Sequence, residues 1–301
     1  MRYSILLEKI KTGRGDKNIM GKSMEKDKLF SVEGKICIVT GGLGQLGAQY
    51  VKALHERGAK VAVFGRHVDH EKAKQTFNGI GCELDEDIRF YQVDIVKKEE
   101  LNTALDDIEK IWGTPTVLVN NAGIDTQPSA PPEVSGPFEN FPEDVFRRVV
   151  EVNLVGTFLA CQAVGARMRS ADVEGSIINV GSIYGMVSPV QDIYAYKKEL
   201  TGVPFIKPVA YSAAKSGIYN LTRYLATYWG KEKIRVNTFT PSGVWRDTQD
   251  EHFQKNYCAR MPIGRMARED EYNGVIIFLA SDASRYMTGS NVIVDGGWTA
   301  W

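Results

Sequence analysis

The stretch Ile36-Cys37-Ile38-Val39-Thr40-Gly41-Gly42-Leu43-Gly44-Gln45-Leu46-Gly47 decides the fold of this chain. A short apolar run leads directly into a glycine-rich turn, and a helical pattern follows at once. Gly42, Gly44 and Gly47 have the spacing GxGxxG, which permits a tight turn, a close approach of backbone to a pyrophosphate, and close packing of helix on strand. A glycine turn can also be a simple structural break. The strand–turn–helix context favours a dinucleotide site, with the phosphates at the helix start.

The rest of the chain alternates between short β-branched runs and longer segments with helical spacing, which is typical of a doubly wound parallel sheet. The runs predicted as strands are Ile36–Thr40, Lys60–Phe64, Arg89–Val93, Thr116–Asn120, Ser176–Val180, Arg235–Phe239 and Asn291–Val294. The segments predicted as helices include Gly47–Glu56, Glu99–Ile111, Glu143–Arg169, Ser212–Gly230 and Asp270–Ala280. Several strand runs are apolar throughout, as in strands buried on both faces. The pattern predicts an α/β, Rossmann-type, seven-stranded parallel sheet with helices on both faces.

The prediction places a single domain over residues 32–301. Residues 1–31 are predicted to be a polar N-terminal extension, either frayed or the product of an upstream start, since Met20 and Met24 both precede the fold. Two segments are longer than ordinary connections, and such loops are usually functional or disordered. We expect an insertion at 188–209 and a lid at 242–265 to form the pocket for a substrate.

Composition excludes several classes of function. The 301 residues contain 37 basic and 37 acidic side chains, so no net field exists to recruit nucleic acid or an anionic membrane. The four cysteines form no CxxC or Cys/His cluster, and His67 with His70 is more typical of an exposed helix start than of a metal site. No apolar run is long enough for a membrane span or a signal peptide. We therefore expect a cytoplasmic protein that binds a small molecule and no metal.

The residues at the end of the second predicted strand bear on the choice of dinucleotide. The fingerprint would place an acid there, on the adenosine ribose, but Gly65 and Arg66 occupy the position. A guanidinium can pair with a 2′-phosphate. NADP(H) is therefore favoured, while NAD(H) stays open because Asp69 could fold back to the ribose and Arg66 could be a solvated loop residue.

Three further segments complete a recognisable pattern: Asn120-Asn121-Ala122-Gly123 after the fourth predicted strand, Ser182 after the fifth, and Tyr211-Ser212-Ala213-Ala214-Lys215 opening a helix. With these, the chain resembles the classical short-chain dehydrogenase/reductase family from about Val32 to Trp301. The resemblance extends to Asp94, Asn153 and the closing Val294-Asp295-Gly296-Gly297. It implies hydride transfer between a nicotinamide cofactor and a carbonyl or carbinol carbon.

The chemistry expected of the tyrosine motif follows from its spacing. Tyr211 and Lys215 lie four residues apart, on one face of a helix. An ammonium about 4 Å from a phenol is worth roughly 4 kcal/mol at an effective dielectric near 20, enough to lower a pKa of about 10 by some three units before burial opposes it, so that the catalytic pKa approaches the operating pH. The resemblance implies that Ser182 binds the substrate oxygen, that Lys215 also holds the nicotinamide ribose, and that Asn153 anchors a water in the proton relay.

A second YxxxK motif competes for the catalytic position. Tyr194 and Lys198 have the same spacing and would give the shorter distance from Ser182 that is usual in the family. We prefer Tyr211, because small residues separate it from Lys215 and a regular helical pattern follows. This choice requires that the insertion at 188–209 loops out and returns.

The pattern and the resemblance together predict which residues bind the ligands. Those expected at the cofactor are Gly41, Gly42, Gly44, Gln45, Leu46, Gly65, Arg66, Asp94, Ile95, Asn121, Ala122, Gly123, Tyr211, Lys215, Pro241, Gly243 and Val244. Those expected at the substrate are Tyr184, Gln191, Tyr194, Trp245 and Gln249. Aromatic faces with interspersed amides suit a sugar-like, polyhydroxylated ligand. The same aromatics could instead form lid and subunit core, and hydroxysteroid or 3-oxoacyl-thioester ketones stay open as substrates.

Two departures from the family pattern raise rival functions. Gly44 lies where the extended relatives, which include sugar-nucleotide epimerases, have their glycine, but too little chain follows Tyr211 for their substrate domain. Arg246 stands at a usual threonine position; Thr248 could substitute for that threonine, and backbone contacts from Val244 are expected in preference. A non-catalytic NADP-binding regulator or scaffold would be expected to lack a catalytic residue, and none is lacking.

By analogy with the family, we expect a homotetramer or homodimer. Its subunit contacts would be formed by Asp144–Arg169 and Ser212–Gly230.

Overall fold

The computed structural model describes residues 28–301. Of the predicted N-terminal extension, residues 1–27 lie outside the described part. Its last residues include a 3-10 helix, η1 (Lys28–Phe30), and the Phe30 ring lies 6.4 Å from that of Phe278.

The sheet has seven strands in the order β3-β2-β1-β4-β5-β6-β7, and every neighbouring pair is parallel. Their bounds are β1 (Ile36–Thr40), β2 (Lys60–Gly65), β3 (Ile88–Gln92), β4 (Val117–Asn120), β5 (Gly175–Val180), β6 (Ile234–Pro241) and β7 (Asn291–Val294). The predicted seven-stranded parallel Rossmann sheet is confirmed. β1, β4 and β5 are buried at every position, as expected for strands covered on both faces.

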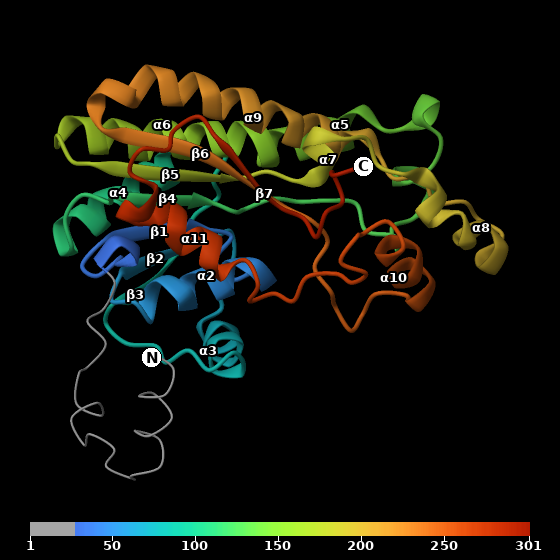
Figure 1. Cartoon of the computed structure of the whole chain (residues 1–301), viewed down its shortest axis with the longest axis horizontal. Coiled ribbons are helices and arrows are strands. Elements are labelled where there is room, and N and C mark those ends of the chain that lie inside the picture. Colours follow the sequence, from blue (N-terminus) through green and yellow to red (C-terminus); the bar gives the residue numbers. More distant parts are fainter. Residues whose placement is uncertain (1–27) are drawn as a thin grey trace, which may run out of the picture.

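Helices cover both faces of this sheet (Figure 1). One apolar core lies under α2 (Gln45–His55), α3 (His70–Gly79) and α11 (Asn273–Ala280). The other lies under α4 (Lys98–Ile111), α6 (Gly156–Ser170) and α9 (Val209–Trp229). Between α5 (Glu143–Val150) and α6, the five residues of η4 (Glu151–Val155) are π-helical.

The helical run Glu143–Ser170 is the one described segment that is long and apolar enough to cross a membrane. Of its most apolar window, 56% is buried inside the protein. Its apolar side chains, such as Cys161, Val164 and Met168, belong to the core beneath α6. Packing on the sheet therefore accounts for just over half of this apolar window.

The insertion and the lid contain short helices that the sequence did not predict. The insertion holds η5 (Gln191–Tyr194) and α8 (Tyr196–Thr201), and the lid holds α10 (Glu251–Cys258). Figure 1 shows α8 and α10 at the same end of the molecule, beyond the carboxyl end of β6. Both segments contribute to a third core, here called the aromatic cluster, made of Ile183, Tyr184, Ile193, Tyr194, Phe205, Tyr257, Met261, Met266 and Trp298.

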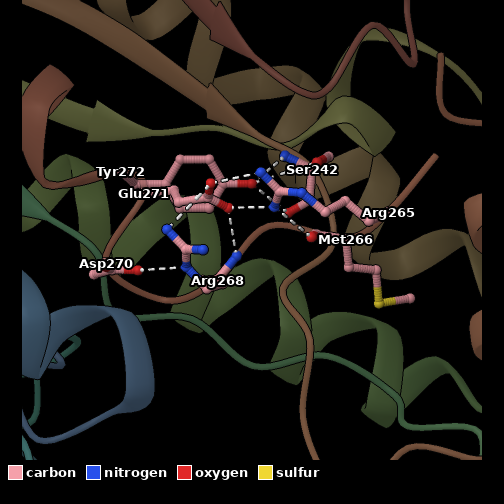
Figure 2. A network of polar contacts seen from close by, with 7 residues as sticks. All are labelled: Ser242, Arg265, Met266, Arg268, Asp270, Glu271 and Tyr272. Carbon is pink, nitrogen blue, oxygen red and sulfur yellow. Dashed lines mark hydrogen bonds and ion pairs between the residues drawn. The ribbon is translucent and has the colours of Figure 1, made fainter. Parts of the chain in front are cut away.

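The two ends of the lid are held by consecutive residues, Glu271 and Tyr272 (Figure 2). The backbone N–H of Ser242 donates to the Tyr272 hydroxyl at 3.2 Å. The Arg265 guanidinium binds both carboxylate oxygens of Glu271, at 2.6 and 2.7 Å. Both ends of the lid are therefore held beside the sheet by one short stretch of chain.

Candidate active site

The glycine turn after β1 forms a cradle with no room for side chains. Gly41 has φ +63°, and a Cβ placed on it would lie 2.8 Å from Cα of Ala122. A Cβ on Gly47 would lie 2.2 Å from the carbonyl oxygen of Gly41. Gly44 caps the start of α2, where backbone N–H groups are unpaired. This geometry fits a pyrophosphate at the helix start.

A cleft of about 380 Å³ opens from this turn. Ten of the residues expected at the cofactor line it: Gly41, Gly44, Gln45, Leu46, Arg66, Asp94, Ile95, Asn121, Ala122 and Gly123. Its wall also contains residues that the sequence reasoning did not assign to the cofactor: Phe64, Val93, Ile124, Arg148, Val152 and Arg246. The elongated set of glycines, apolar side chains and arginines fits a dinucleotide.

The other residues expected at the cofactor lie outside this wall. A Cβ on Gly42 would meet Val63, and one on Gly65 would meet Leu43, so both glycines serve close packing. Pro241 ends β6, and Gly243 donates its N–H to the Tyr257 hydroxyl at 2.8 Å. Val244 forms an isolated β-bridge with Ala267 at the base of the lid.

The turn after β4 is held by a threonine that the sequence reasoning missed. The Thr40 hydroxyl accepts hydrogen bonds from the backbone N–H groups of Asn121 and Ala122, both at 3.1 Å. The Asn121 amide in turn donates to the carbonyl oxygens of Thr40 and Gly41, at 3.2 and 3.1 Å. Its side chain therefore joins the two loops that form the cleft.

Asn153 lies fully buried in the π-helical segment η4, a kind of irregularity that is frequent at functional sites. Its Oδ1 accepts from the backbone N–H of Ile124 at 2.7 Å, and its Nδ2 donates to the carbonyl oxygen of Ile124 at 2.8 Å. The amide thus fixes the backbone just after Gly123, on the wall of the cleft.

Ser182, Tyr211 and Lys215 come together from α7 (Ile183–Met186) and α9. Ser182 is the N-cap of α7, where its Oγ accepts from the Tyr184 N–H at 3.2 Å, and its side chain lowers the pKa of the Tyr211 phenol. Lys215 Nζ lies 5.9 Å from the centroid of the Tyr211 ring and donates to the Val180 carbonyl at 2.6 Å. The same Nζ lies 3.8 Å from where a Cβ on Gly123 would be, so the group adjoins the cofactor cleft.

The titration of this group differs from the expectation. Burial raises the pKa of Tyr211 well above its ordinary value, Asp125 raises it further, and the hydrogen bond with Ser182 opposes them. Burial also lowers the pKa of Lys215 to about 8. The expectation that the pKa of Tyr211 approaches the operating pH is therefore wrong for this structure, because burial outweighs any lowering by Lys215 and the ammonium is directed at Val180.

The competing tyrosine, Tyr194, lies elsewhere. It is 3% exposed in the aromatic cluster, where its ring lies 4.9 Å from Phe205 and is stacked on Phe253 at 5.7 Å. Lys198 is exposed on α8. The structure therefore places this second YxxxK motif on the outer segment and not beside the cleft.

The other residues expected at the substrate have varied surroundings. Tyr184 is buried against Trp298, with ring centroids 6.3 Å apart. Gln191 binds the backbone N–H and carbonyl of Lys207, and Gln249 accepts from Arg246 N–H and donates to the Val244 carbonyl. Both amides therefore hold loop backbone in place, Gln191 in the insertion and Gln249 in the lid. Trp245 is 48% exposed at the start of the lid.

Two charged residues near Tyr211 were not predicted at all. Lys207 Nζ lies 2.6 Å from Asp125 Oδ2 and 5.8 Å from the centroid of the Tyr211 ring. One residue, Ile124, separates Asp125 from the Asn-Asn-Ala-Gly segment, and Lys207 lies near the carboxyl end of the insertion. No periodic pattern marks either residue.

Comparison with known proteins assigns the family. A family profile described as short chain dehydrogenase matches residues 35–257. The chain belongs to the short-chain dehydrogenase family. The matched range contains the glycine turn, Asn153, Ser182, Tyr211 and Lys215. This short-chain dehydrogenase is an oxidoreductase that acts on CH–OH groups of a small molecule with a nicotinamide cofactor.

Individual relatives agree with the family assignment. A trans-4-hydroxycyclohexanecarboxylate dehydrogenase of Sinomonas cyclohexanicum is 34% identical over 275 residues, 89% of this chain and 94% of the relative. A solved short-chain dehydrogenase of Leptospira borgpetersenii with bound NAD+ has a TM-score of 0.74 and 31% identity, covering 89% of this chain and 93% of that one. A gluconate 5-dehydrogenase of Burkholderia cenocepacia, in complex with NADP and tartrate, has a TM-score of 0.75 and 28% identity, covering 91% and 98%.

Proposed function

We propose that this short-chain dehydrogenase interconverts a ketone and a secondary alcohol on a small, sugar-like substrate, with Tyr211 as general acid and base. One observation carries the proposal: Ser182, Tyr211 and Lys215 converge beside a cleft that fits a dinucleotide. When bound, the nicotinamide supplies or accepts the hydride. In reduction, Tyr211 gives its proton to the carbonyl oxygen while the Ser182 hydroxyl donates to the same oxygen; in oxidation, Tyr211 takes the proton back.

The proposal includes a preference for NADP(H). Arg66 lines the cofactor cleft, where a guanidinium can pair with a 2′-phosphate. Asp69, the residue that could have bound a ribose in NAD(H), caps α3 by accepting from the N–H groups of Glu71 and Lys72, both at 3.1 Å. Its carboxylate is therefore already engaged in capping α3.

The substrate class is supported by the names of relatives. Two relatives bear the names of cyclic or polyhydroxylated acids, hydroxycyclohexanecarboxylate and gluconate. A hydroxysteroid or 3-oxoacyl-thioester ketone is the alternative substrate within this reaction class.

We also propose a homotetramer or homodimer in the cytoplasm. Phe158 on α6 is 42% exposed, and Tyr224 and Tyr228 on α9 are 62% and 56% exposed and stacked on each other. Exposed aromatic side chains on these two helices support a contact between subunits there. Light scattering on the purified protein should give two or four chains, and Tyr224→Asp should lower that number; a monomeric wild type would contradict this part.

The reaction is tested with a panel of polyols, sugar acids, hydroxysteroids and 3-oxoacyl thioesters, using both cofactors and following the absorbance of reduced nicotinamide. We expect turnover of a polyol or sugar acid, faster with NADP+ than with NAD+. Tyr211→Phe should lower kcat by about 10²–10⁴-fold while cofactor still binds. The matched control is Tyr286→Phe, because Tyr286 is fully exposed. Undiminished turnover in Tyr211→Phe would overturn the proposal, and tight NADPH binding without turnover of any compound would favour a regulator.

A further inference from the structure

A buried ion pair outside the expected catalytic group lies next to Tyr211. Lys207 Nζ donates to Asp125 Oδ2 at 2.6 Å and to the Thr126 carbonyl at 2.8 Å. The lysine side chain is 5% exposed and the aspartate side chain 27%. The pair joins the loop after β4 to the end of the insertion, two segments that are 82 residues apart in the chain.

Hydrogen bonds to its backbone and to its ammonium both fix the position of Lys207. Its backbone N–H donates to Gln191 Oε1 at 2.9 Å, and its carbonyl accepts from Gln191 Nε2 at 3.1 Å. With backbone and ammonium both bound, the side chain has little rotational freedom. The insertion therefore presents one defined charge to the active site.

The Tyr211 ring thus has two ammonium groups at nearly the same distance from its centroid, Lys207 at 5.8 Å and Lys215 at 5.9 Å. They are bound differently. Lys215 donates to the Val180 carbonyl, and burial lowers its pKa to about 8. Lys207 is paired with a carboxylate, Asp125, that acts on both Tyr211 and Lys215.

We propose that Lys207 is a positioning residue for the reaction: by neutralising Asp125 beside the phenol, it sets the pH range in which Tyr211 exchanges its proton. The inference rests on the proposed function, since it requires Tyr211 to be the proton donor and acceptor. Without Lys207, the Asp125 carboxylate would be a bare negative charge that opposes ionisation of the phenol. Without Asp125, Lys207 would be a bare positive charge that favours it.

The other groups that lie around Tyr211 come from three elements. They are Ser182 and Tyr184 of the β5–α7 region and Tyr219 and Lys215 of α9, with Tyr257 of the lid also coupled to it. The tyrosines are neutral at ordinary pH, and burial raises the pKa of each further. Beside burial, Asp125 is therefore the charge that raises the pKa of the phenol, and Lys207 is the cation paired with that carboxylate.

The test compares Lys207→Met, Asp125→Asn, the double variant and Lys207→Arg in the full-length enzyme saturated with NADP+. Tyrosinate absorbance is titrated against pH for each variant, and the titration of the same variant carrying Tyr211→Phe is subtracted to isolate Tyr211. A charge about 6 Å away at an effective dielectric near 20 corresponds to a shift of about one to two pH units. Lys198→Met, at an exposed lysine of the same insertion, is the matched control.

We expect the Tyr211 midpoint to rise in Lys207→Met, to fall in Asp125→Asn, and to return close to the wild-type value in the double variant and in Lys207→Arg. If Lys207→Met does not fold, the fall in Asp125→Asn and the recovery in the double variant still test the proposal. Unchanged midpoints, or shifts of the same sign in the two single variants, would overturn it. Full turnover by Tyr211→Phe would instead overturn the proposed function, so the two failures are distinguishable.

Discussion

Nε of Arg246 donates to Oε1 of Gln45 at 2.6 Å, so the first residues of the lid are tied to the first turn of α2. Nε2 of the same Gln45 amide donates to the Trp245 carbonyl at 3.1 Å. Both Arg246 and Gln45 line the cofactor cleft. An arginine at a position where the family usually has threonine therefore places a cation at the mouth of the cleft, close to the turn that fits a pyrophosphate.

Replacing this arginine should weaken cofactor binding. We expect Arg246→Ala to raise the Kd of NADP+ and NAD+ alike by about 10-fold, because a charge-assisted hydrogen bond is worth roughly 1.5 kcal/mol or more. Titration calorimetry measures both constants. Arg260→Ala, at an exposed arginine of the same lid, should leave them unchanged. An unaltered Kd in Arg246→Ala would show that the cation does not act on the cofactor.

Arg66 should decide between the two cofactors. We expect Arg66→Ala to raise the Kd of NADPH by about 10- to 100-fold and to leave that of NADH nearly unchanged, since only NADPH carries the 2′-phosphate. Fluorescence of the bound reduced cofactor provides the measurement. Arg57→Ala, an exposed arginine before β2, is the control. Equal losses for both cofactors would argue against a 2′-phosphate contact.

The glycine turn should not tolerate a methyl group at Gly47. Its Cβ would lie 2.2 Å from the Gly41 carbonyl oxygen, so we expect Gly47→Ala to destabilise the protein by about 1–3 kcal/mol and to weaken cofactor binding. Gly274→Ala is the matched control, because Gly274 is also helical but has no atom near its Cβ position. Urea unfolding should show Gly274→Ala unchanged or slightly more stable. Similar losses in both variants would mean that crowding is not the cause.

The lid anchor should be sensitive to acid. Hydrogen bonds from Arg265 lower the pKa of Glu271 from 4.5 to about 2. A depressed carboxyl pKa stabilises the folded state fully above its unfolded value, and that contribution is lost as the pH falls toward the folded value.

Glu271→Gln should therefore lower the free energy of unfolding by about 1 kcal/mol near pH 7, a magnitude typical of a partly exposed pair, and the difference from wild type should shrink as pH falls from 4.5 toward 2. Urea unfolding at several pH values measures it. Glu143→Gln removes a more exposed pair with Arg147 and should have little effect at any pH. A difference that persists undiminished in acid would exclude the ion pair as its source.

The sheet could be predicted closely because its strands carry their own signal. β1 and β7 have the predicted bounds, and the remaining strands differ by one or two residues, since a continuous β-branched run between turn residues is a local property. The glycine turn and the Tyr211–Lys215 spacing are local in the same sense. Each was visible in fewer than a dozen consecutive residues.

The substrate side could not be predicted in this way. Helix α10 is polar along most of its length, and its buried Tyr257 packs on Trp298, with ring centroids 4.4 Å apart, from the far end of the chain. The pairing of Lys207 with Asp125 depends on how the insertion folds back. The titration of Tyr211 was predicted wrongly for the same reason, because burial and Asp125 are properties of the assembled site.

The aromatic cluster packs the insertion and the lid into a single structural unit. Tyr194 of the insertion stacks on Phe253 of the lid, and Asn256 of the lid donates to the Ile193 carbonyl at 3.1 Å. A chimera that received either segment alone from a homologue would expose half of this apolar surface to water. Substrate preference in this enzyme should therefore be transplanted only when both segments are exchanged together.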